Sequence, residues 1–372
     1  MKILFVTNIP SPYRINFFNH LGLRCNLDVL YEAKYQEGIK YDFEKTKPLH
    51  FTHFFVSRKK LKPKKISFSL VRYLKKNSNQ YDKIILSNYS NISVILAINY
   101  MIIKKIDYYL EVDGGIIKKD FWLKRKLKTH LISNAKAIFS PSNYTDQYLK
   151  AYGFKRSIFR YPFSSITQND ILSFNELEKN KILARKTLKI KYKKVVITVA
   201  QLIHRKGIDV LLKSAKIISS EIDHVGFYVI GDDYTNPYLE LKDELDLSNV
   251  HFEGFKNKDQ LRDYYLAADI FVLPTREDIW GLVINEAMAY GIPVITTKNC
   301  VAGIELIKQG YNGFLVDVED YNGIAKAVID MLSDNEMLQN FSINALGLIR
   351  NYTIEKMAMT HFESLHGETF KG

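Results

Sequence analysis

Apolar, strand-like runs alternate with helix-like segments along this chain in two successive rounds, and this alternation restricts the fold more than any other feature. It favours parallel sheets covered by helices on both faces. The first round predicts strands at 3–7, 27–31, 84–87, 108–112, 137–140 and 158–161, with helices at 15–23, 92–104, 122–134 and 144–152. The second round predicts strands at 195–200, 227–230, 250–252, 270–273, 293–296 and 313–316. Three further helices are predicted at 321–333, 336–349 and 354–366.

A polar, irregular segment separates the two rounds. The 372 residues exceed what one hydrophobic core usually supports. We therefore expect an α/β protein of two Rossmann-like domains that face each other across a cleft. The boundaries expected are a first domain at 1–163, a linker region at 164–192, a second domain at 193–350, and a C-terminal helix at 351–372 that returns to the first domain.

Positive charge is concentrated in the first half of the chain. Residues 1–163 hold 30 Lys and Arg against 11 Asp and Glu, whereas the remainder holds 23 against 29. Basic clusters lie at 58–65 and 118–128, and the second of them interleaves its charges with Phe121, Trp122, Leu123 and Leu127. This pattern favours an anionic membrane surface or a phosphate-bearing acceptor. Nucleic acid would accept the same charges but is not the partner we expect, and a solvated lysine-rich surface remains the competing interpretation.

The expected location is cytoplasmic and peripheral, at the inner face of the cell membrane. Cys25 and Cys300 show no metal or redox spacing, as expected for free thiols in a reducing compartment. The chain opens on a strand rather than a signal peptide. Its longest apolar stretch, 92–103, is shorter than the ~20 residues that a spanning helix needs.

Several ligand fingerprints are missing from the sequence. It has no G-x-G-x-x-G after the first strand, no P-loop and no G-x-S-x-G elbow. It also has no Asp-x-Asp triplet, through which many sugar transferases hold a diphosphate by way of a divalent cation. A diphosphate would therefore be bound by backbone amides and cationic side chains, without a metal.

A carboxylate in an apolar helix marks the second domain. The segment 274–293 reads as a strand end, an acidic loop and a helix from about Gly281 whose residues are mostly apolar. We expect that helix, and Glu286 with it, to be buried. A buried carboxylate needs a partner, which is either a structural salt bridge or the hydroxyl pair of a ligand.

A helix N-terminus preceded by two cationic residues lies earlier in the same domain. A strand ends near Ala200, and a helix begins at about Gly207 directly after Arg205 and Lys206. Helix N-termini offer free amides and the positive end of the dipole, and the two cations add charge-assisted donors. This arrangement fits a diphosphate site, with a solvated basic turn as the alternative. Both segments follow the carboxyl ends of strands in the same sheet, and open α/β sheets bind ligands at the carboxyl edge.

Together these segments resemble retaining glycosyltransferase family four, whose second domain carries the pattern Glu-x7-Glu-Ala. Asp278 and Glu286-Ala287 have that spacing, and 200–207 resembles the family's glycine-rich, basic turn. Further matches lie at 229–232, 250–255 and 303–316, and the opening 7–14 is similar to capsule and exopolysaccharide members. The resemblance implies a GT-B fold and transfer of a hexose, with retention of configuration, from a nucleotide diphosphate sugar to a glycan or polyprenyl-diphosphate-linked acceptor in bacterial surface polysaccharide synthesis. A UDP-sugar is the favoured donor.

The resemblance also implies roles for individual residues. Glu286 would hold the ribose hydroxyls and Lys206, with Arg205 and Gly207, the donor phosphates. Backbone amides at Leu282 and Val283 would cap the diphosphate, and the turn with Phe255 and Lys256 would hold the base. The acceptor side would include Tyr13 and Arg14, and Asp113 would face the transferred sugar or the acceptor.

Three positions depart from the family pattern. The first acid is Asp278 with Glu277 beside it, so either one could reach the sugar. The usual phosphate-binding Arg is Gln201, and Asp113 stands where a His is common. A nucleotide-sugar epimerase of the same shape, and a non-catalytic partner of a transferase, are the alternative functions.

Overall fold

The computed structural model describes residues 1–34, 47–57, 67–231 and 236–369. The chain divides into two compact units. One comprises Met1–Ser165 together with Tyr352–Gly372, and the other comprises Ile166–Asn351. The basic cluster expected at 58–65 lies outside the described residues.

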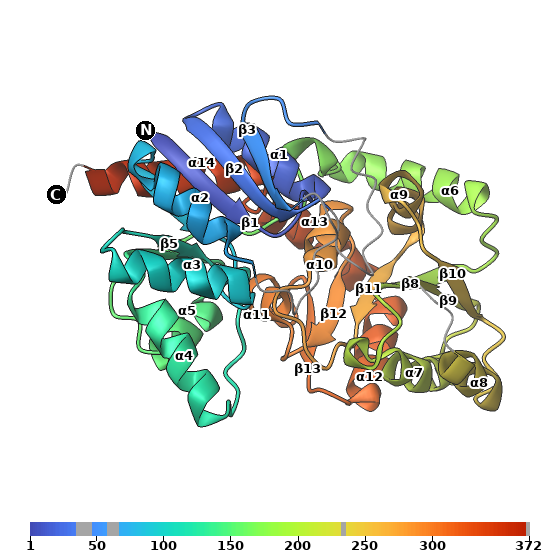
Figure 1. The fold of residues 1–372 in the computed structure, drawn as a ribbon. Coiled ribbons are helices and arrows are strands. Elements are labelled where there is room, and N and C mark those ends of the chain that lie inside the picture. The colour runs from blue at the N-terminus through green and yellow to red at the C-terminus, as the bar shows by residue number, and fades with distance from the viewer. Residues whose placement is uncertain (35–46, 58–66, 232–235, 370–372) are drawn as a thin grey trace. The chain divides into compact units, whose positions relative to one another are not determined.

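The first unit is built on a seven-stranded parallel sheet with the order β3-β2-β1-β4-β5-β6-β7. Figure 1 labels four of these strands, β1, β2, β3 and β5. Its strands are β1 (Lys2–Thr7), β2 (Asn26–Ala33), β3 (Thr52–Ser57), β4 (Lys83–Leu86), β5 (Tyr109–Glu111), β6 (Ala137–Ser140) and β7 (Ser157–Arg160). Its helices are α1 (Pro12–Gly22), α2 (Ser69–Asn77), α3 (Ile92–Ile103), α4 (Trp122–Ser133), α5 (Asn143–Ala151) and α14 (Ile354–Thr369), with the short helix η1 (Ser78–Gln80).

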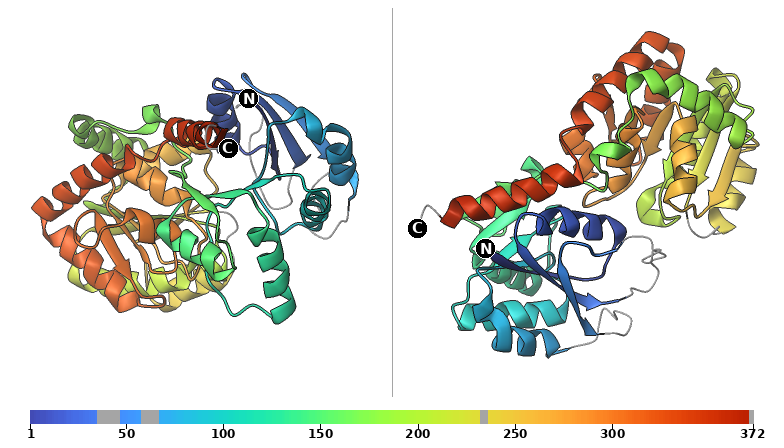
Figure 2. Two further views of the ribbon diagram at one scale, coloured as in Figure 1. Left: turned by 90° about the vertical axis from the view of Figure 1, so that its left-hand side faces the viewer. Right: turned by 90° about the horizontal axis from the view of Figure 1, so that it is seen from above.

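Alternation of side chains along the strands explains how helices cover both faces of this sheet. Leu4 and Val6 of β1 join a core cluster with residues of α2, α3, α4 and α5. Phe5, between them, packs instead against Phe17 and Phe18 of α1. The C-terminal helix α14 packs on α1 and contacts β7, so the last segment of the chain completes this unit (Figure 2).

The second unit holds a six-stranded parallel sheet with the order β10-β9-β8-β11-β12-β13. Its strands are β8 (Lys194–Val199), β9 (Val225–Ile230), β10 (Val250–Gly254), β11 (Ile270–Leu273), β12 (Val294–Thr297) and β13 (Gly313–Val316). Its helices are α6 (Leu177–Thr187), α7 (Ile208–Glu221), α8 (Asn236–Glu244), α9 (Lys258–Ala267), α10 (Leu282–Ala289), α11 (Val301–Leu306), α12 (Tyr321–Ser333) and α13 (Asn335–Ile349), with the short helices η2 (Gln168–Asp170), η3 (Phe174–Glu176) and η4 (His204–Lys206).

Both sheets confirm the prediction of two parallel α/β domains. In each sheet the strand order reverses beside the first strand, at β1/β4 in one unit and at β8/β11 in the other. Ligands of doubly wound sheets bind at such a switch point, outside the carboxyl ends of the strands.

The region expected as a linker, 164–192, packs within the second unit from Ile166 onward. Helix α6 lies against α9, and its Arg185 is anchored beside β11 by an ion pair with Asp269 at 2.6 Å. Strand β3 and helix α2 were not among the predicted elements. Both cysteines are free, and Cys300 is buried.

Candidate functional site

The basic turn of the second unit begins where β8 ends. Helix η4 carries Arg205 and Lys206, and Gly207 follows with a left-handed backbone at φ 69°. A Cβ at Gly207 would lie 2.1 Å from the carbonyl oxygen of Pro274, so glycine is required for this approach of the two loops. Helix α7 then starts, with its N-terminus beside the two cations.

The loop after β11 meets this turn. The Lys206 ammonium forms an ion pair with Asp278, and both side chains are nearly buried. Nη1 of Arg205 donates to the carbonyl oxygen of Glu277 at 2.8 Å and lies 3.9 Å from the Asp278 carboxylate. The structure therefore brings together Arg205, Lys206, Glu277 and Asp278, although about 70 positions of sequence separate the two pairs.

The Arg276 side chain holds the loop after β8 and the loop after β11 together. Its guanidinium donates to both carboxylate oxygens of Asp209, at 2.9 and 2.6 Å, and also pairs with Glu319. Its Nη1 reaches the carbonyl oxygen of His204 at 2.5 Å, and its backbone N–H donates to the carbonyl oxygen of Arg205 at 2.8 Å. The sequence analysis missed this residue, although an arginine beside two acids at a strand end was a usable signal.

The environment of Glu286 differs from the one expected. Helix α10 is buried along Ile284, Ala287 and Met288, whereas Glu286 is half-buried. Leu282, Glu286 and Tyr290 recur at intervals of four and share the half-exposed face. The prediction of a buried Glu286 is therefore wrong, because an apolar composition does not fix which side of a helix faces the core.

A tyrosine supplies a hydrogen bond to Glu286. The hydroxyl of Tyr265 donates to Oε2 of Glu286 at 3.0 Å. The Tyr265 ring is buried and stacks on Tyr290 with centroids 5.3 Å apart. Burial, together with the neighbouring carboxylate, raises the pKa of Tyr265 well above its usual value, so this hydroxyl remains a donor.

The start of α10 provides backbone amides on the same edge of the sheet. Gly281, with φ 105°, precedes the helix, so Leu282 and Val283 occupy its first turn. The first amides of a helix have no intrahelical acceptor and lie at the positive end of its dipole.

The turn after β10 places Phe255 and Lys256. Phe255 is half exposed, and Lys256 lies 3.7 Å from Glu253 and over the ring of Tyr264. Gln201 is exposed, just beyond the end of β8. The predicted residues of the second unit therefore follow carboxyl ends of its strands or begin the helices that come next, except Glu286, which lies one turn into α10.

In the first unit, the predicted acceptor-side residue Arg14 is buried in a charged cluster. Its guanidinium forms ion pairs with Glu111, at the end of β5, and with Asp113 at 2.6 Å. His361 of α14 completes the cluster, with Nε2 3.0 Å from the Glu111 carboxylate and its ring stacked on Phe139.

The two carboxyls of this cluster have opposite pKa shifts. Burial acts to raise the pKa of Glu111, but the Arg14 guanidinium and the His361 hydrogen bond outweigh it, so the pKa is lowered. Burial raises the pKa of Asp113 to about 6, because Arg14 compensates less there and Glu111 repels the second charge. The Asp113 side chain is also 30% exposed, unlike that of Glu111.

These contacts alter what the first-unit residues can do. Arg14 is committed to two carboxylates, Tyr13 lies beside its guanidinium, and Asp113 is the member that solvent can reach. Glu111 and His361 were missed by the sequence analysis. A charged residue inside the predicted strand 108–112 was the available signal for Glu111.

The aromatic residues of the second basic cluster are exposed. Helix α4 begins at Trp122, and its first turns present apolar side chains beside lysines to solvent: Phe121, Trp122, Leu123 and Leu127. Asp120 anchors this end of the helix through Lys128 at 2.7 Å and Lys124 at 3.0 Å. Among the described residues, no helix is long and apolar enough to cross a membrane.

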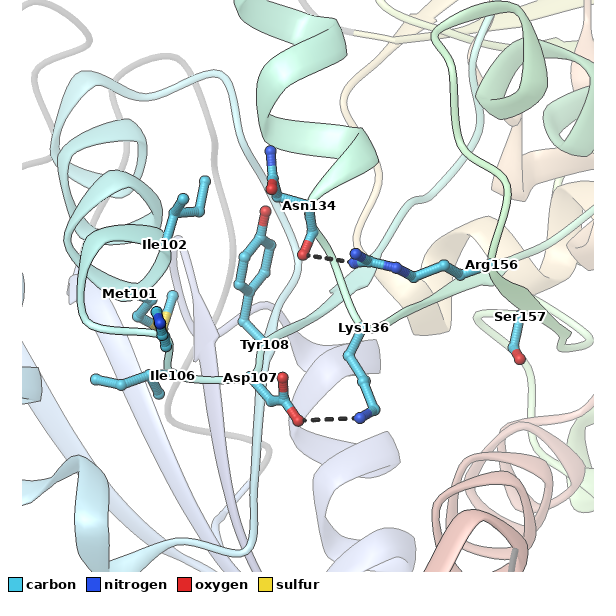
Figure 3. Close-up of a pocket in the computed structure, with 10 residues that line it drawn as sticks. Met101, Ile102, Ile106, Asp107, Tyr108, Asn134, Lys136, Arg156 and Ser157 are labelled. Carbon is cyan, nitrogen blue, oxygen red and sulfur yellow. Dashed lines mark hydrogen bonds and ion pairs between the residues drawn. The ribbon is translucent and has the colours of Figure 1, made fainter. Parts of the chain in front are cut away.

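A cavity of about 540 Å³ lies at the opposite edge of the first unit's sheet (Figure 3). Its lining comes mainly from the segments that lead into β5, β6 and β7, and two of its cationic side chains have partners close by. Lys136 lies 3.2 Å from Asp107, and Arg156 donates to the carbonyl oxygen of Asn134. This cavity is therefore separate from the strand ends described above.

Comparisons with known proteins identify a family domain in the second unit. Residues 179–347 match the family model "Glycosyl transferases group 1", so the chain contains a glycosyltransferase group 1 domain. The chain is 29% identical over 174 residues to the capsular polysaccharide biosynthesis glycosyltransferase CapM of Staphylococcus aureus, covering 46% of each chain. It is 30% identical over 146 residues to the lipopolysaccharide core biosynthesis glycosyltransferase LpsE of Rhizobium meliloti, covering 38% of this chain and 41% of the relative.

These alignments span less than half the length of the two relatives. The crystal structure of Anabaena HepE in complex with UDP superposes with a TM-score of 0.78, covering 99% of this chain and 100% of that one at 18% identity. That likeness confirms the predicted GT-B fold.

Proposed function

We propose that this chain, with its glycosyltransferase group 1 domain in a GT-B fold, transfers a hexose from a UDP-sugar to a glycan acceptor in surface polysaccharide synthesis. The observation that carries the proposal is the contact of the Arg205–Lys206 turn with the Glu277–Asp278 loop, at the switch point of the second sheet. Cations for a diphosphate and acids for sugar hydroxyls lie side by side there.

The donor's diphosphate would bind to Lys206, Arg205 and the first amides of α10. Each group is a hydrogen-bond donor with positive charge or partial charge, and such groups stabilise the charge that develops on a leaving diphosphate. We propose that these donors take the place of a metal ion, so that transfer needs none.

The remaining donor contacts follow from the same edge. Glu286 would accept hydrogen bonds from the ribose hydroxyls while Tyr265 orients its carboxylate. Asp278 or Glu277 would receive hydroxyls of the transferred sugar, and the turn at Phe255 and Lys256 would hold the base. Anabaena HepE, which has the same fold, was crystallised in complex with UDP, and this supports uracil as that base.

Retention of configuration follows if the acceptor attacks from the face that the diphosphate leaves, with the leaving phosphate taking the acceptor proton. The new bond joins the acceptor oxygen to the anomeric carbon as the bond from that carbon to the phosphate oxygen breaks. Carboxylate nucleophiles, as in many glycosidases, are not required by this scheme.

The acceptor side would belong to the first unit. The half-exposed Asp113 carboxylate, fixed by Arg14, would accept a hydrogen bond from the acceptor hydroxyl. A lipid-linked acceptor fits the exposed aromatic and basic start of α4, because that surface suits an anionic membrane.

Nucleotide binding tests the proposal. A thermal-shift series with UDP, GDP, ADP and their sugars identifies the donor, since a ligand at 100 times its Kd stabilises by about 2.7 kcal/mol. Calorimetry with that nucleotide then compares wild type with Lys206→Ala and Glu286→Ala, which we expect to weaken binding about 10- to 100-fold.

Lys181→Ala is the matched control. Lys181 also pairs with a nearly buried aspartate, Asp269 at 2.9 Å, but at the amino end of the strands. Its nucleotide affinity should equal that of wild type. Unchanged affinity in both Lys206→Ala and Glu286→Ala would rule out this donor site.

A further inference from the structure

A second group of polar side chains lies at the carboxyl edge of the first unit's sheet, apart from the Arg14 cluster. Glu32 lies near the end of β2, Thr7 ends β1 and is followed by Asn8, and Ser87 and Asn88 follow β4. These three strands are neighbours and parallel, so their ends meet. The group therefore lies beside the switch point of the sheet, where doubly wound domains bind ligands.

Glu32 is the unusual member of this group. Its side chain is buried, and its two oxygens accept hydrogen bonds from Nδ2 of Asn88 at 2.8 Å and from Nδ2 of Asn91 at 2.7 Å. In the described parts of the chain, both of its donors are neutral amides. Burial raises the pKa of Glu32 to about 7, because these amides compensate only part of the lost hydration.

The two hydrogen bonds of Glu32 join β2 to the loop before α3, but both come from neutral amides. Buried carboxylates usually have a cationic partner, and a costly polar group at a strand end is typical of a functional site. The two hydrogen bonds from these amides leave two of the four lone-pair directions of the carboxylate for other donors. Asn8, half-exposed on the adjacent strand, donates its amide nitrogen to none of the described residues.

A carboxylate bordered by amides is suited to the hydroxyls of a sugar, since hydroxyl groups both donate to the acid and accept from the amides. Glu32 on β2 and Asp113 after β5 are separated by three strand spacings. This separation is about 14 Å at the usual spacing between neighbouring strands, which is longer than one sugar ring.

We propose that Glu32, with Asn8 and Asn88, forms an acceptor subsite that binds the hydroxyls of a sugar other than the one that reacts beside Asp113. The inference rests on the proposed function, and it extends that function to a substrate class. The acceptor carries at least two sugar units, and Glu32 contributes to acceptor binding rather than to the transfer step.

The competing role of Glu32 is mechanical. Asn91 caps α3, its side chain accepting from the backbone N–H of Ser93, so Glu32 also ties the loop before α3 to β2. A purely mechanical role affects folding and leaves the acceptor KM unchanged, whereas a subsite changes the acceptor KM.

The test uses Glu32→Gln with Asp28→Asn as the matched control. Asp28 lies on the same strand and the same face, four residues earlier, and likewise accepts a hydrogen bond, from Tyr81 at 2.9 Å. Transfer from the radiolabelled UDP-sugar to lipid-linked glycans, extracted from membranes of the producing cells, is measured while the acceptor concentration is varied.

We expect Glu32→Gln to raise the acceptor KM about 10- to 100-fold, with the donor KM and the unfolding temperature at pH 5 close to wild type. Asp28→Asn should leave both KM values unchanged. Trimming the acceptor to one sugar should reduce wild-type kcat/KM to the level of Glu32→Gln. An unchanged acceptor KM in Glu32→Gln overturns this inference alone. A wild-type protein that transfers no label from any donor overturns the proposed function and the inference with it.

Discussion

Replacing Glu32 by Gln should make the first unit more stable at alkaline pH, and the gain should disappear in acid. Below pH 4.5 the carboxyl is protonated in both the folded and the unfolded chain. Between pH 4.5 and about 7 the folded chain keeps a proton that the unfolded chain has lost, so stability falls as the pH rises. Above about pH 7 the folded chain holds a buried carboxylate at its full cost, which Gln avoids.

The magnitude follows from the pKa. A rise from 4.5 to about 7 corresponds to about 3 kcal/mol of destabilisation at pH 8. Gln keeps an oxygen for Asn88 but presents a second donor to Asn91, and the lost hydrogen bond costs about 1 kcal/mol. Because that loss applies at every pH, the pH-dependent part alone should amount to about 2–3 kcal/mol between pH 5 and pH 8.

Calorimetry of the full chain at pH 5 and at pH 8 measures this difference. For a unit of this size each kcal/mol shifts the unfolding temperature by about 2–4 °C. The difference in Tm between Glu32→Gln and wild type should therefore increase by roughly 5–10 °C from pH 5 to pH 8. Asp28→Asn provides the reference for a carboxyl on the same strand. A difference in Tm that stays constant across this pH range would refute the assignment of a costly buried charge to Glu32.

Three further outcomes follow from the same geometry. EDTA should leave transfer intact, because Arg205 and Lys206 supply the charge for the diphosphate; activity that is lost and then restored by manganese or magnesium would contradict this. Four basic residues of α4 are changed to Gln: Lys124, Arg125, Lys126 and Lys128. This variant should no longer bind vesicles of anionic lipid at low salt, while its UDP affinity is preserved. Equal pelleting of the wild type with neutral and anionic vesicles would indicate that this part of α4 is only a solvated surface. Arg276→Met should weaken UDP binding about tenfold, because the hydrogen bonds and ion pairs that hold the two donor loops together are lost. The control Arg185→Met loses its contacts with Asp269 and with two carbonyls at the amino ends of the strands, and should only lower the Tm. Equal UDP affinity in the two variants would show that Arg276 does not support the donor site.

The strand–helix alternation was sufficient to predict the two sheets, since parallel strands buried on both faces read as continuous apolar runs. It failed at β3, an edge strand in which polar and aromatic residues mix, Thr52 and His53 among them. Edge strands are buried less than central ones, and their sequence pattern is correspondingly weaker. The same reasoning placed 164–192 as a linker because it is polar, although the salt bridge of Arg185 attaches α6 to the second unit.

For the site, the doubly wound topology accounts for the residues of the second unit that lie together. Segments that follow β8 and β11 must meet, because these strands are neighbours in a doubly wound sheet. The contact of Lys206 with Asp278 follows from that topology. The burial of Glu286 did not follow, because one face of this apolar helix, with Leu282 and Glu286, is only partly buried. His361 could not be paired with Glu111 from the sequence, since 250 positions separate them.

Three buried or partly buried carboxyl groups of the first unit differ in how far their burial is compensated. Glu111, fully buried, receives Arg14 and His361, and its pKa is lowered, so its charge is compensated in place. Glu32 and Asp113 stand at the same edge of the sheet, and burial raises the pKa of each, to about 7 and about 6. All three acids lie at the carboxyl edge of the sheet, but only Glu111 has hydrogen bonds from both Arg14 and His361, so the uncompensated cost of burial at Glu32 and Asp113 is the feature that favours a ligand at these two positions.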